Sequence, residues 1–411
     1  MQIVLRFFLL LLLTPASSYA DLQPDVIDFE SEITVASWLF PESPLYNGQE
    51  HNNSSIAFES ELYAEWSKGN NIVFTPFILF DNQDSSRSHF DIREAIYSWY
   101  GDDWETSIGI GQVFWGVTES KNLVDIINQF DAVYDPLYKT KLGQPLVNLT
   151  LIRDSGYYEF YILPYFRERT SPGKKGRLRL DPEFSKGSTK FEGGSQWTPE
   201  LAIRWSNSYN DYDISLHSFL GYSRSPSIDV LLADGKLKYE PNYQRIRQIG
   251  GTVQKTSDAT LYKLEWLAKD GQKDGNFRRG GYFSSVLGFE HTLYKLIGDL
   301  GDLGLLMEYS FDSRRSRSTD SLQDDIFIAA RLTLNDSDDT QMLLGSILDL
   351  DGDGQMYQID FGKRLNDSLT FGIKGAIYQN GKYNSNLYIL RQDSWVEINF
   401  CLLYTSDAAD E

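Results

Sequence analysis

The chain has 411 residues, with 58 acidic side chains against 38 lysines and arginines, which gives a formal net charge of −20 at pH 7. This balance excludes a general nucleic-acid-binding protein, which needs a basic face for phosphates. The single cysteine excludes a disulfide scaffold and a cysteine-ligated zinc site.

The first twenty residues have the layout of a secretory signal peptide. Arg6 precedes an apolar run from Phe7 to Leu13, and small residues lead to an expected cleavage point after Ala20. No later stretch reaches the roughly 18 apolar residues of a membrane helix. We therefore expect an exported chain whose mature part begins at residue 21 and crosses no membrane as a helix.

From residue 27 onward the dominant pattern alternates apolar and polar side chains. In 200–206, Leu201 and Ile203 share one face of a strand, and Arg204 lies on the other. In 91–97 neither face is clean, which a β-bulge would explain. About eighteen strands are predicted, near 27–40, 55–67, 71–81, 89–100, 104–115, 146–154, 156–166, 197–208, 211–223, 241–256, 258–269, 280–293, 303–313, 323–335, 339–350, 355–365, 368–378 and 394–400.

The connections between these strands are sorted by parity. Those after odd-numbered strands are mostly long, and those after even-numbered strands are mostly tight turns. An outer-membrane barrel has this arrangement, and its closure pairs every backbone polar group within the membrane. We therefore predict an all-β fold: a single transmembrane antiparallel β-barrel of 16 to 18 strands over residues 21–400, with short periplasmic turns and long extracellular loops. A secreted β-sandwich, the alternative, predicts no such sorting.

Aromatic residues make up 14% of the chain and often fall near strand ends. In a membrane barrel such residues form girdles at the two interfaces. The expected girdle residues are Trp66, Trp99, Trp104, Trp205, Tyr212 and Tyr378.

Three short motifs lie between residues 88 and 131: Arg93–Ala95, Gln112–Gly116 and Asp125–Asn128. Together they resemble a large family of uncharacterised proteobacterial outer-membrane proteins that is related to porins. The resemblance implies an outer-membrane location and the passage of small solutes, hydrophobic ones included. It names no substrate.

The long connection at 116–145 is the best candidate for a loop that folds into the barrel, because an eighteen-stranded barrel is wide enough for an aqueous channel. A short helical pattern runs from Leu123 to Phe130 within it. The constriction candidates are Asp125, Asn128 and Asp131. The alternative is an external loop that covers the rim.

Charged residues on the polar faces of the predicted strands are the candidates for the lumen. They carry both signs, which suits a hydrated interior and does not specify an ion preference. The candidates are Glu59, Glu61, Glu65, Arg204, Lys263, Glu265, Glu290, Glu308, Arg331, Asp360, Arg364 and Lys374.

The long extracellular loop at 167–196 is locally basic inside an acidic protein. Such a rim could bind lipopolysaccharide phosphates or attract anionic solutes; the alternative is a solvated loop with ordinary charge scatter. The rim candidates are Arg167, Arg169, Lys174, Lys175, Arg177 and Arg179.

Two further patterns are weak. Asp349, Asp351, Asp353 and Asp360 match the spacing of a calcium loop, but a tight acidic hairpin explains the segment better, so no metal or other cofactor is expected. His217 shares a strand face with Ser215, as a hydrolase would need. Neither a cross-strand partner nor an oxyanion site is visible, so we predict no enzyme.

The last eleven residues, 401–411, continue no pattern and match the in-frame translation of a sequencing-library adapter. We therefore expect the native chain to reach residue 400 and continue into other residues. The sequence predicts a porin-like passive channel for small solutes, with outer-membrane lipid, lipopolysaccharide and the barrel-assembly machinery as partners. The alternatives are a non-conducting barrel with a surface-binding or structural role and, remotely, an outer-membrane hydrolase.

Overall fold

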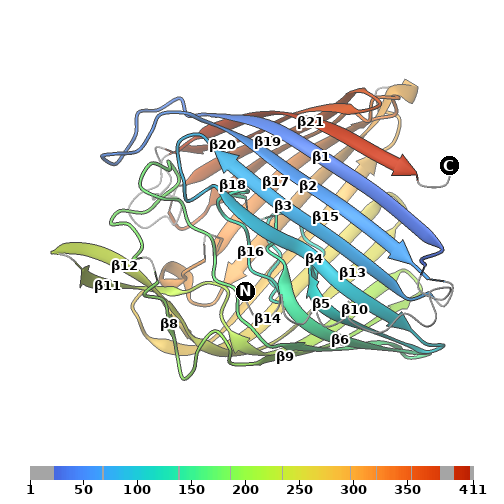
Figure 1. Cartoon of the computed structure of the whole chain (residues 1–411), viewed down its shortest axis with the longest axis horizontal. Helices are drawn as coiled ribbons and strands as arrows, with labels where there is room; N and C mark the ends of the chain where they lie inside the picture. Colours follow the sequence, from blue (N-terminus) through green and yellow to red (C-terminus); the bar gives the residue numbers. More distant parts are fainter. Residues whose placement is uncertain are drawn as a thin grey trace.

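A computed structural model describes residues 23–407, except 67–68, 138, 186, 234, 297, 321, 353 and 380–392. The predicted signal peptide, Asp353 and residues 408–411 lie outside the described residues. Eighteen antiparallel strands form one sheet that closes on itself, because β1 pairs with β2 on one side and β21 on the other. Figure 1 shows the resulting barrel.

Each predicted strand has its counterpart in the barrel, so the predicted fold class is confirmed. The barrel strands are β1 (Val26–Leu39), β2 (Asn53–Glu65), β3 (Asn71–Asp81), β4 (His89–Tyr100), β5 (Trp104–Gly111), β6 (Gln144–Arg153), β7 (Gly156–Leu163), β9 (Glu200–Tyr209), β10 (Tyr212–Tyr222), β13 (Arg245–Ser257), β14 (Thr260–Lys273), β15 (Arg279–Leu293), β16 (Gly301–Asp312), β17 (Asp324–Leu334), β18 (Gln341–Asp349), β19 (Gln355–Asn366), β20 (Leu369–Gln379) and β21 (Trp395–Asp407). Two 3-10 turns, η2 (Gly298–Leu300) and η3 (Arg315–Arg317), lie between strands. Among the described residues no helix is long and apolar enough to cross a bilayer.

The prediction missed a small second sheet in the loops. β11 (Ser227–Ala233) and β12 (Lys236–Tyr243) form a hairpin, and β8 (Lys190–Phe191) pairs with β12 in parallel. The range 224–240 was expected to be loop. Figure 1 shows this hairpin projecting beyond the rim that carries the long loops, while the short turns lie at the other end.

The irregular alternation in 91–97 has its cause in a β-bulge. Thr75 pairs with Glu94 while the next residue, Pro76, pairs with Ile92, which leaves Arg93 as the extra residue of β4. Pro76 has no N–H to donate to the sheet, so the interruption leaves no donor unpaired there. The bulge changes which side chains of β4 face the interior.

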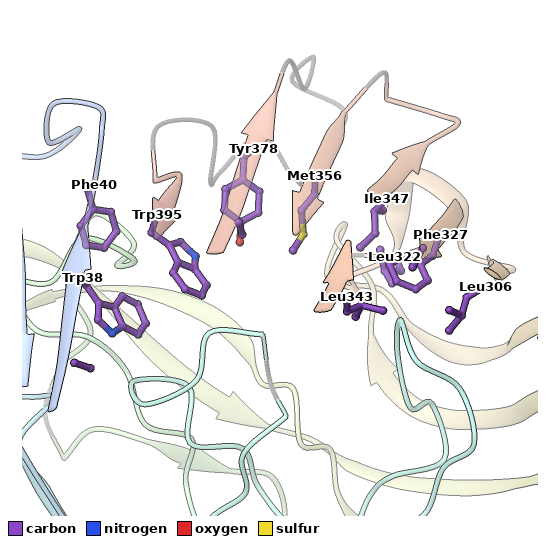
Figure 2. Close-up of a cluster of buried hydrophobic side chains, with 13 residues drawn as sticks. Trp38, Phe40, Leu306, Leu322, Phe327, Leu343, Ile347, Met356, Tyr378 and Trp395 are labelled. Atoms are coloured by element: carbon purple, nitrogen blue, oxygen red, sulfur yellow. The ribbon is translucent and has the colours of Figure 1, made fainter. Parts of the chain in front are cut away.

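A cluster of buried apolar side chains lines the interior near the long-loop ends of β16–β21 and β1. Trp38 and Trp395 stack with their ring centres 4.8 Å apart, and Figure 2 shows them beside Tyr378 and Met356 on neighbouring strands. Tyr378, expected in an aromatic girdle, is instead buried in this cluster. Its position two residues beyond the inward-facing Ala376 explains this, since alternate residues share a face.

Residues 401–407, predicted to derive from an adapter, continue β21 along β1. Cys401 pairs with Thr34, and Asp407 pairs with Asp28. The seam that closes the barrel is therefore completed by residues that we predict to stand in place of native ones.

Candidate functional site

The loop at 112–143 leaves the wall after β5 and crosses the inside of the barrel. Its residues 117–120 bind β14 and β16, which lie five and seven strands away from β6 around the ring of eighteen. A segment that starts at one wall and binds the facing wall must pass through the lumen. The loop at 112–143 is called the constriction loop below.

The apolar side of the constriction loop packs against the wall next to its own strands. Trp115, Val124 and Ile127 are buried in a cluster with side chains from β6, β7, β9, β10 and β13. The helical spacing seen in the sequence therefore reflects a packed face, although the segment forms turns and not a helix. Burial of these side chains ties the loop to the wall.

The three predicted constriction residues are buried and have hydrogen-bond or ionic partners. Asp125 lies 2.5 Å from Lys141 Nζ. Asn128 accepts a hydrogen bond from the backbone of Val113 and donates two to backbone carbonyls, one of them that of Leu142, all within 2.9 Å. Each side chain holds the fold of the loop and does not project freely into an opening.

Asp131 is the strongest of these anchors. Arg93 donates to its carboxylate at 2.8 Å, and His89 Nε2 lies 2.9 Å from the same oxygen. Burial would raise the pKa of Asp131, but the hydrogen bond and charge of His89 and the charge of Arg93 lower it to about 2. The loop is thus fixed to β4 by an ionised carboxylate.

Among the predicted lumen residues, Glu265, Glu308 and Arg331 contact the constriction loop directly. Glu265 and Glu308 accept hydrogen bonds from its backbone. Arg331 binds Glu119 of the loop at 2.6 Å. These three residues were predicted as wall charges, and the structure shows that their partners belong to the loop.

The neighbours of the other predicted lumen residues belong mainly to the wall and its short turns, although Arg204 also lies 5.8 Å from the ring centre of Trp115 in the loop. Lys263 lies 3.3 Å from Glu290, which also approaches Arg331, and Arg204 binds Glu159 at 2.9 Å. Asp360 stands opposite Lys374 in the sheet, and Arg364 pairs with Asp339 beside a short turn. Glu59 and Glu61 face Glu32 and Glu30 across β1 and β2, and Glu65 accepts a hydrogen bond from Tyr63.

A cavity of about 570 Å³ lies above the constriction loop, on the side of the long loops. We call it the vestibule. Its basic residues are Lys121, Lys139, Lys141, Arg169, Arg224 and Lys269, against the acidic Glu119, Asp125 and Asp320. The rest of the lining includes apolar side chains such as Leu267, Ile347 and Met356. A basic, half-apolar chamber has thus formed inside an acidic protein.

Lys269 differs from the other vestibule lysines in its partner, because its ammonium group lies 5.8 Å from the ring centre of Tyr282 and not beside a carboxylate. Lys121, Lys139 and Lys141 each lie within 3.1 Å of a carboxylate, and Arg224 binds Glu200 at 3.0 Å. Within the described part of the chain, no carboxylate lies within ion-pairing distance of Lys269. Lys269 was not among the predicted lumen residues, although it continues the face of Lys263 and Glu265 by alternation.

Most residues of the predicted basic rim form ion pairs or hydrogen bonds within the protein. Arg167 binds Asp91 at 2.5 Å, and Arg169 donates to the carbonyl of Arg224. Arg177 and Arg179 are buried and donate to carbonyls of the loop at 40–52. Irregular loops leave many carbonyls without sheet partners, and the forked guanidinium group satisfies several at once. Of the six candidates, Lys174 and Lys175 are exposed, and Lys175 lies 3.3 Å from Glu50.

The two weak patterns have structural explanations. Asp349 accepts hydrogen bonds from the backbone of Asp351 and Gly352, which closes a tight acidic turn, and Asp360 lies away from it in β19. In the described residues no three His, Cys, Asp or Glu side chains are arranged to hold a metal. Ser215 shares a hydrogen bond with Thr252, and His217 lies 3.0 Å from Gln248, so both have partners outside the suggested dyad.

Comparison with known proteins supports the fold. No family model and no curated protein sequence matches the chain. Among solved structures, OccK3 (OpdO) of Pseudomonas aeruginosa aligns over 94% of this chain and 97% of its own, at 10% identity and a TM-score of 0.54. Acinetobacter baumannii OccAB1 aligns over 94% of this chain and 99% of its own, at 5% identity and a TM-score of 0.56. A BenF-like porin from Pseudomonas fluorescens Pf-5 aligns over 92% of this chain and 98% of its own, at 9% identity and a TM-score of 0.52. At these identities the similarity concerns the architecture.

Proposed function

We propose that the protein is an outer-membrane channel through which small anionic solutes, including those with an apolar part, diffuse passively. The vestibule carries this proposal, because its lining joins the ammonium group of Lys269, which no carboxylate of the described residues pairs with, to an apolar wall. The solved barrels of the same architecture support it, and one of them is named a porin. Membership of the porin-related family indicated by the motifs between residues 88 and 131 is part of the proposal.

Conductance in planar lipid bilayers tests the channel. Purified, folded protein is expected to produce discrete current steps with a preference for anions. The alternative is a non-conducting barrel with a binding or structural role, which the crossing of the lumen by the constriction loop favours. Folded protein that inserts and carries no current would support that alternative.

Lys269→Glu is expected to lower the anion preference severalfold. The substitution replaces a vestibule cation that lies beside no carboxylate of the described residues by an anion, and a charge in a narrow, low-dielectric passage acts strongly on passing ions. The measurement is the reversal potential in a salt gradient. Lys174→Glu makes the same charge change in the exposed outer loop and serves as the control. An equal shift in both variants would contradict the role of Lys269.

The proposed outer-membrane location predicts that a charged side chain on the outer face of the barrel wall lowers the stability of the protein. Ile328 lies near the middle of β17 and is 48% exposed. Ile328→Arg is expected to lower the free energy of unfolding by about 2–4 kcal/mol, because arginine at the bilayer midplane costs that much. The measurement is denaturant unfolding in phospholipid vesicles. Gln358→Arg, in the vestibule, is the matched control, and equal costs in the two variants would argue against the membrane-facing assignment.

The proposed partners follow from the location. Lipid would contact the outward apolar side chains, and the barrel-assembly machinery would insert the chain. Lipopolysaccharide phosphates would meet Lys174 and Lys175, because these are the two rim candidates with exposed side chains.

A further inference from the structure

The tip of the constriction loop, residues 117–124, contacts two buried carboxylates of the wall, those of Glu265 and Glu308. Glu265 of β14 is fully buried. One of its oxygens accepts hydrogen bonds from the backbone N–H groups of Val117 and Thr118, at 2.6 and 3.1 Å. The other oxygen accepts one from the N–H of Val124 at 3.3 Å. A single side chain thus holds both sides of the loop tip.

Glu308 of β16 makes the matching contact with the next residues of the loop. Its oxygens accept hydrogen bonds from the N–H groups of Glu119 and Ser120, both at 2.8 Å. The hydroxyl of Ser120 donates a third, at 2.5 Å. Four consecutive backbone N–H groups, from residue 117 to residue 120, therefore point at two carboxylates.

The chemistry of these contacts requires carboxylates. Every loop group that meets Glu265 or Glu308 in these contacts is a donor, and each carboxylate uses both of its oxygens as acceptors. A glutamine would turn an NH2 group toward at least one N–H donor in either orientation of its amide. Hydrogen bonds to a charged acceptor are also stronger than neutral ones.

Two other kinds of contact join the loop to the facing wall. Leu123 packs in a buried apolar cluster with Leu267 of β14 and Val286 of β15, and Glu119 makes more exposed ion pairs. Glu119 binds Arg331 of β17 and Lys139 of the loop itself, and these two cations keep 37% and 47% of their side-chain surface exposed. Exposed ion pairs contribute little stability and weaken with salt. Among the polar contacts between the loop tip and the facing wall, those of Glu265 and Glu308 are therefore the buried ones.

We propose that Glu265 and Glu308 are positioning residues that hold the tip of the constriction loop across the lumen and thereby set the width of the passage. This inference rests on the proposed channel function. It assigns these two glutamates to the loop, although they were predicted as charges of a hydrated lumen wall. Loss of either carboxylate releases part of the backbone at residues 117–120, and loss of both releases all four of its N–H groups, while Leu123 stays packed against the wall.

The test compares Glu265→Gln, Glu308→Gln and the double variant with wild type in single-channel recordings. We expect a larger and noisier current, with the double variant most affected, because a released tip fluctuates in the passage. Glu61→Gln is the control, since Glu61 faces Glu30 and not the loop. It removes the same charge from the lumen and is expected to leave the noise unchanged. Quiet, wild-type conductance in the double variant would overturn the proposal.

A second readout does not depend on conductance. Amide hydrogen exchange at residues 117–120 is expected to be roughly ten-fold faster or more in the Gln variants, as the loss of charge-assisted hydrogen bonds implies. Unchanged protection would also overturn the proposal. If wild-type protein carries no current while the variants lose protection, the channel function fails and the anchoring stands. Glu265→Asp and Glu308→Asp keep the charge but shorten the side chain, and they replace the Gln variants if these do not fold. The shorter side chain is expected to lose the contacts with the loop. An Asp variant with wild-type protection and a quiet current would therefore overturn the proposal.

Discussion

Replacing residues 117–124 by a four-residue Gly-Ser linker is expected to raise the single-channel conductance several-fold. This segment is the part of the constriction loop that reaches the facing wall, and an eighteen-stranded barrel without it is wide enough for a large aqueous passage. The shorter loop can close, because the two flanks of the segment lie close together: the backbone N–H of Trp115 donates a hydrogen bond to the carboxylate of Asp125 at 3.4 Å. The measurement is conductance in planar bilayers.

The control for this deletion is a change of equal size outside the lumen. Replacing residues 231–238 of the β11–β12 hairpin by the same four-residue linker shortens the projecting sheet by the same number of residues and is expected to leave the conductance near that of wild type. Wild-type conductance after the loop deletion, with a folded barrel shown by its shifted mobility on unheated gels, would mean that the loop does not limit the current.

Arg93→Ala is expected to lower the free energy of unfolding by about 3–5 kcal/mol, the cost of leaving a buried charge without its partner. Arg93 is 3% exposed and donates to Asp91, Asp131 and the carbonyl of Lys141 within 3.1 Å. It also covers the ring of Phe77 at 4.0 Å. Its removal leaves two buried carboxylates with one cationic neighbour fewer.

Denaturant unfolding in vesicles measures this loss. Arg153→Ala is the matched control, since Arg153 pairs with Asp103 on the surface and keeps 44% of its side chain exposed. A surface pair of this kind is worth about 0–1 kcal/mol. Equal losses in the two variants would show that the network around Arg93 contributes no more than a surface ion pair.

The same network predicts a pH dependence. The pKa of Asp131 is lowered to about 2 from the ordinary value of 3.8, so its ionised form is favoured by folding. The stabilisation is therefore present above about pH 4 and is lost as the pH falls toward 2. Asp131→Asn is expected to be less stable than wild type at neutral pH and to approach it near pH 2. A difference that does not change with pH would contradict this assignment.

Local patterns were sufficient to predict the wall of the barrel. Alternation from residue to residue determines which face of a strand is apolar, and all eighteen strands were predicted from it. The hairpin at Ser227–Tyr243 carries the same signal, with Ile228, Val230 and Leu232 on one face. It was overlooked because a long loop was expected there. The two-residue β8 has no period to detect, and its parallel pairing joins distant segments.

The roles of the charged residues were not accessible in the same way. Alternation predicted Glu265 and Glu308 on the inner face, and nothing in it indicated that their acceptors meet backbone donors of a loop. The buried arginines of the loop at 167–196 were predicted as a free rim for a related reason. Charge counted along a loop does not show whether a carbonyl or a carboxylate lies beside each guanidinium group.

The sequence alone predicted a barrel of 16 to 18 strands, the position of each strand along the chain and the end of the barrel that carries the long loops. These properties depend on the two-residue period and on the length of each connection, and both are local. Only the tertiary structure decided the path of the constriction loop and the formation of the vestibule around Lys269. The path joins groups as far apart as Glu119 and Glu308, which are separated by 189 positions. Hydrogen bonds and ion pairs depend on proximity in space, and no spacing along the chain encodes it.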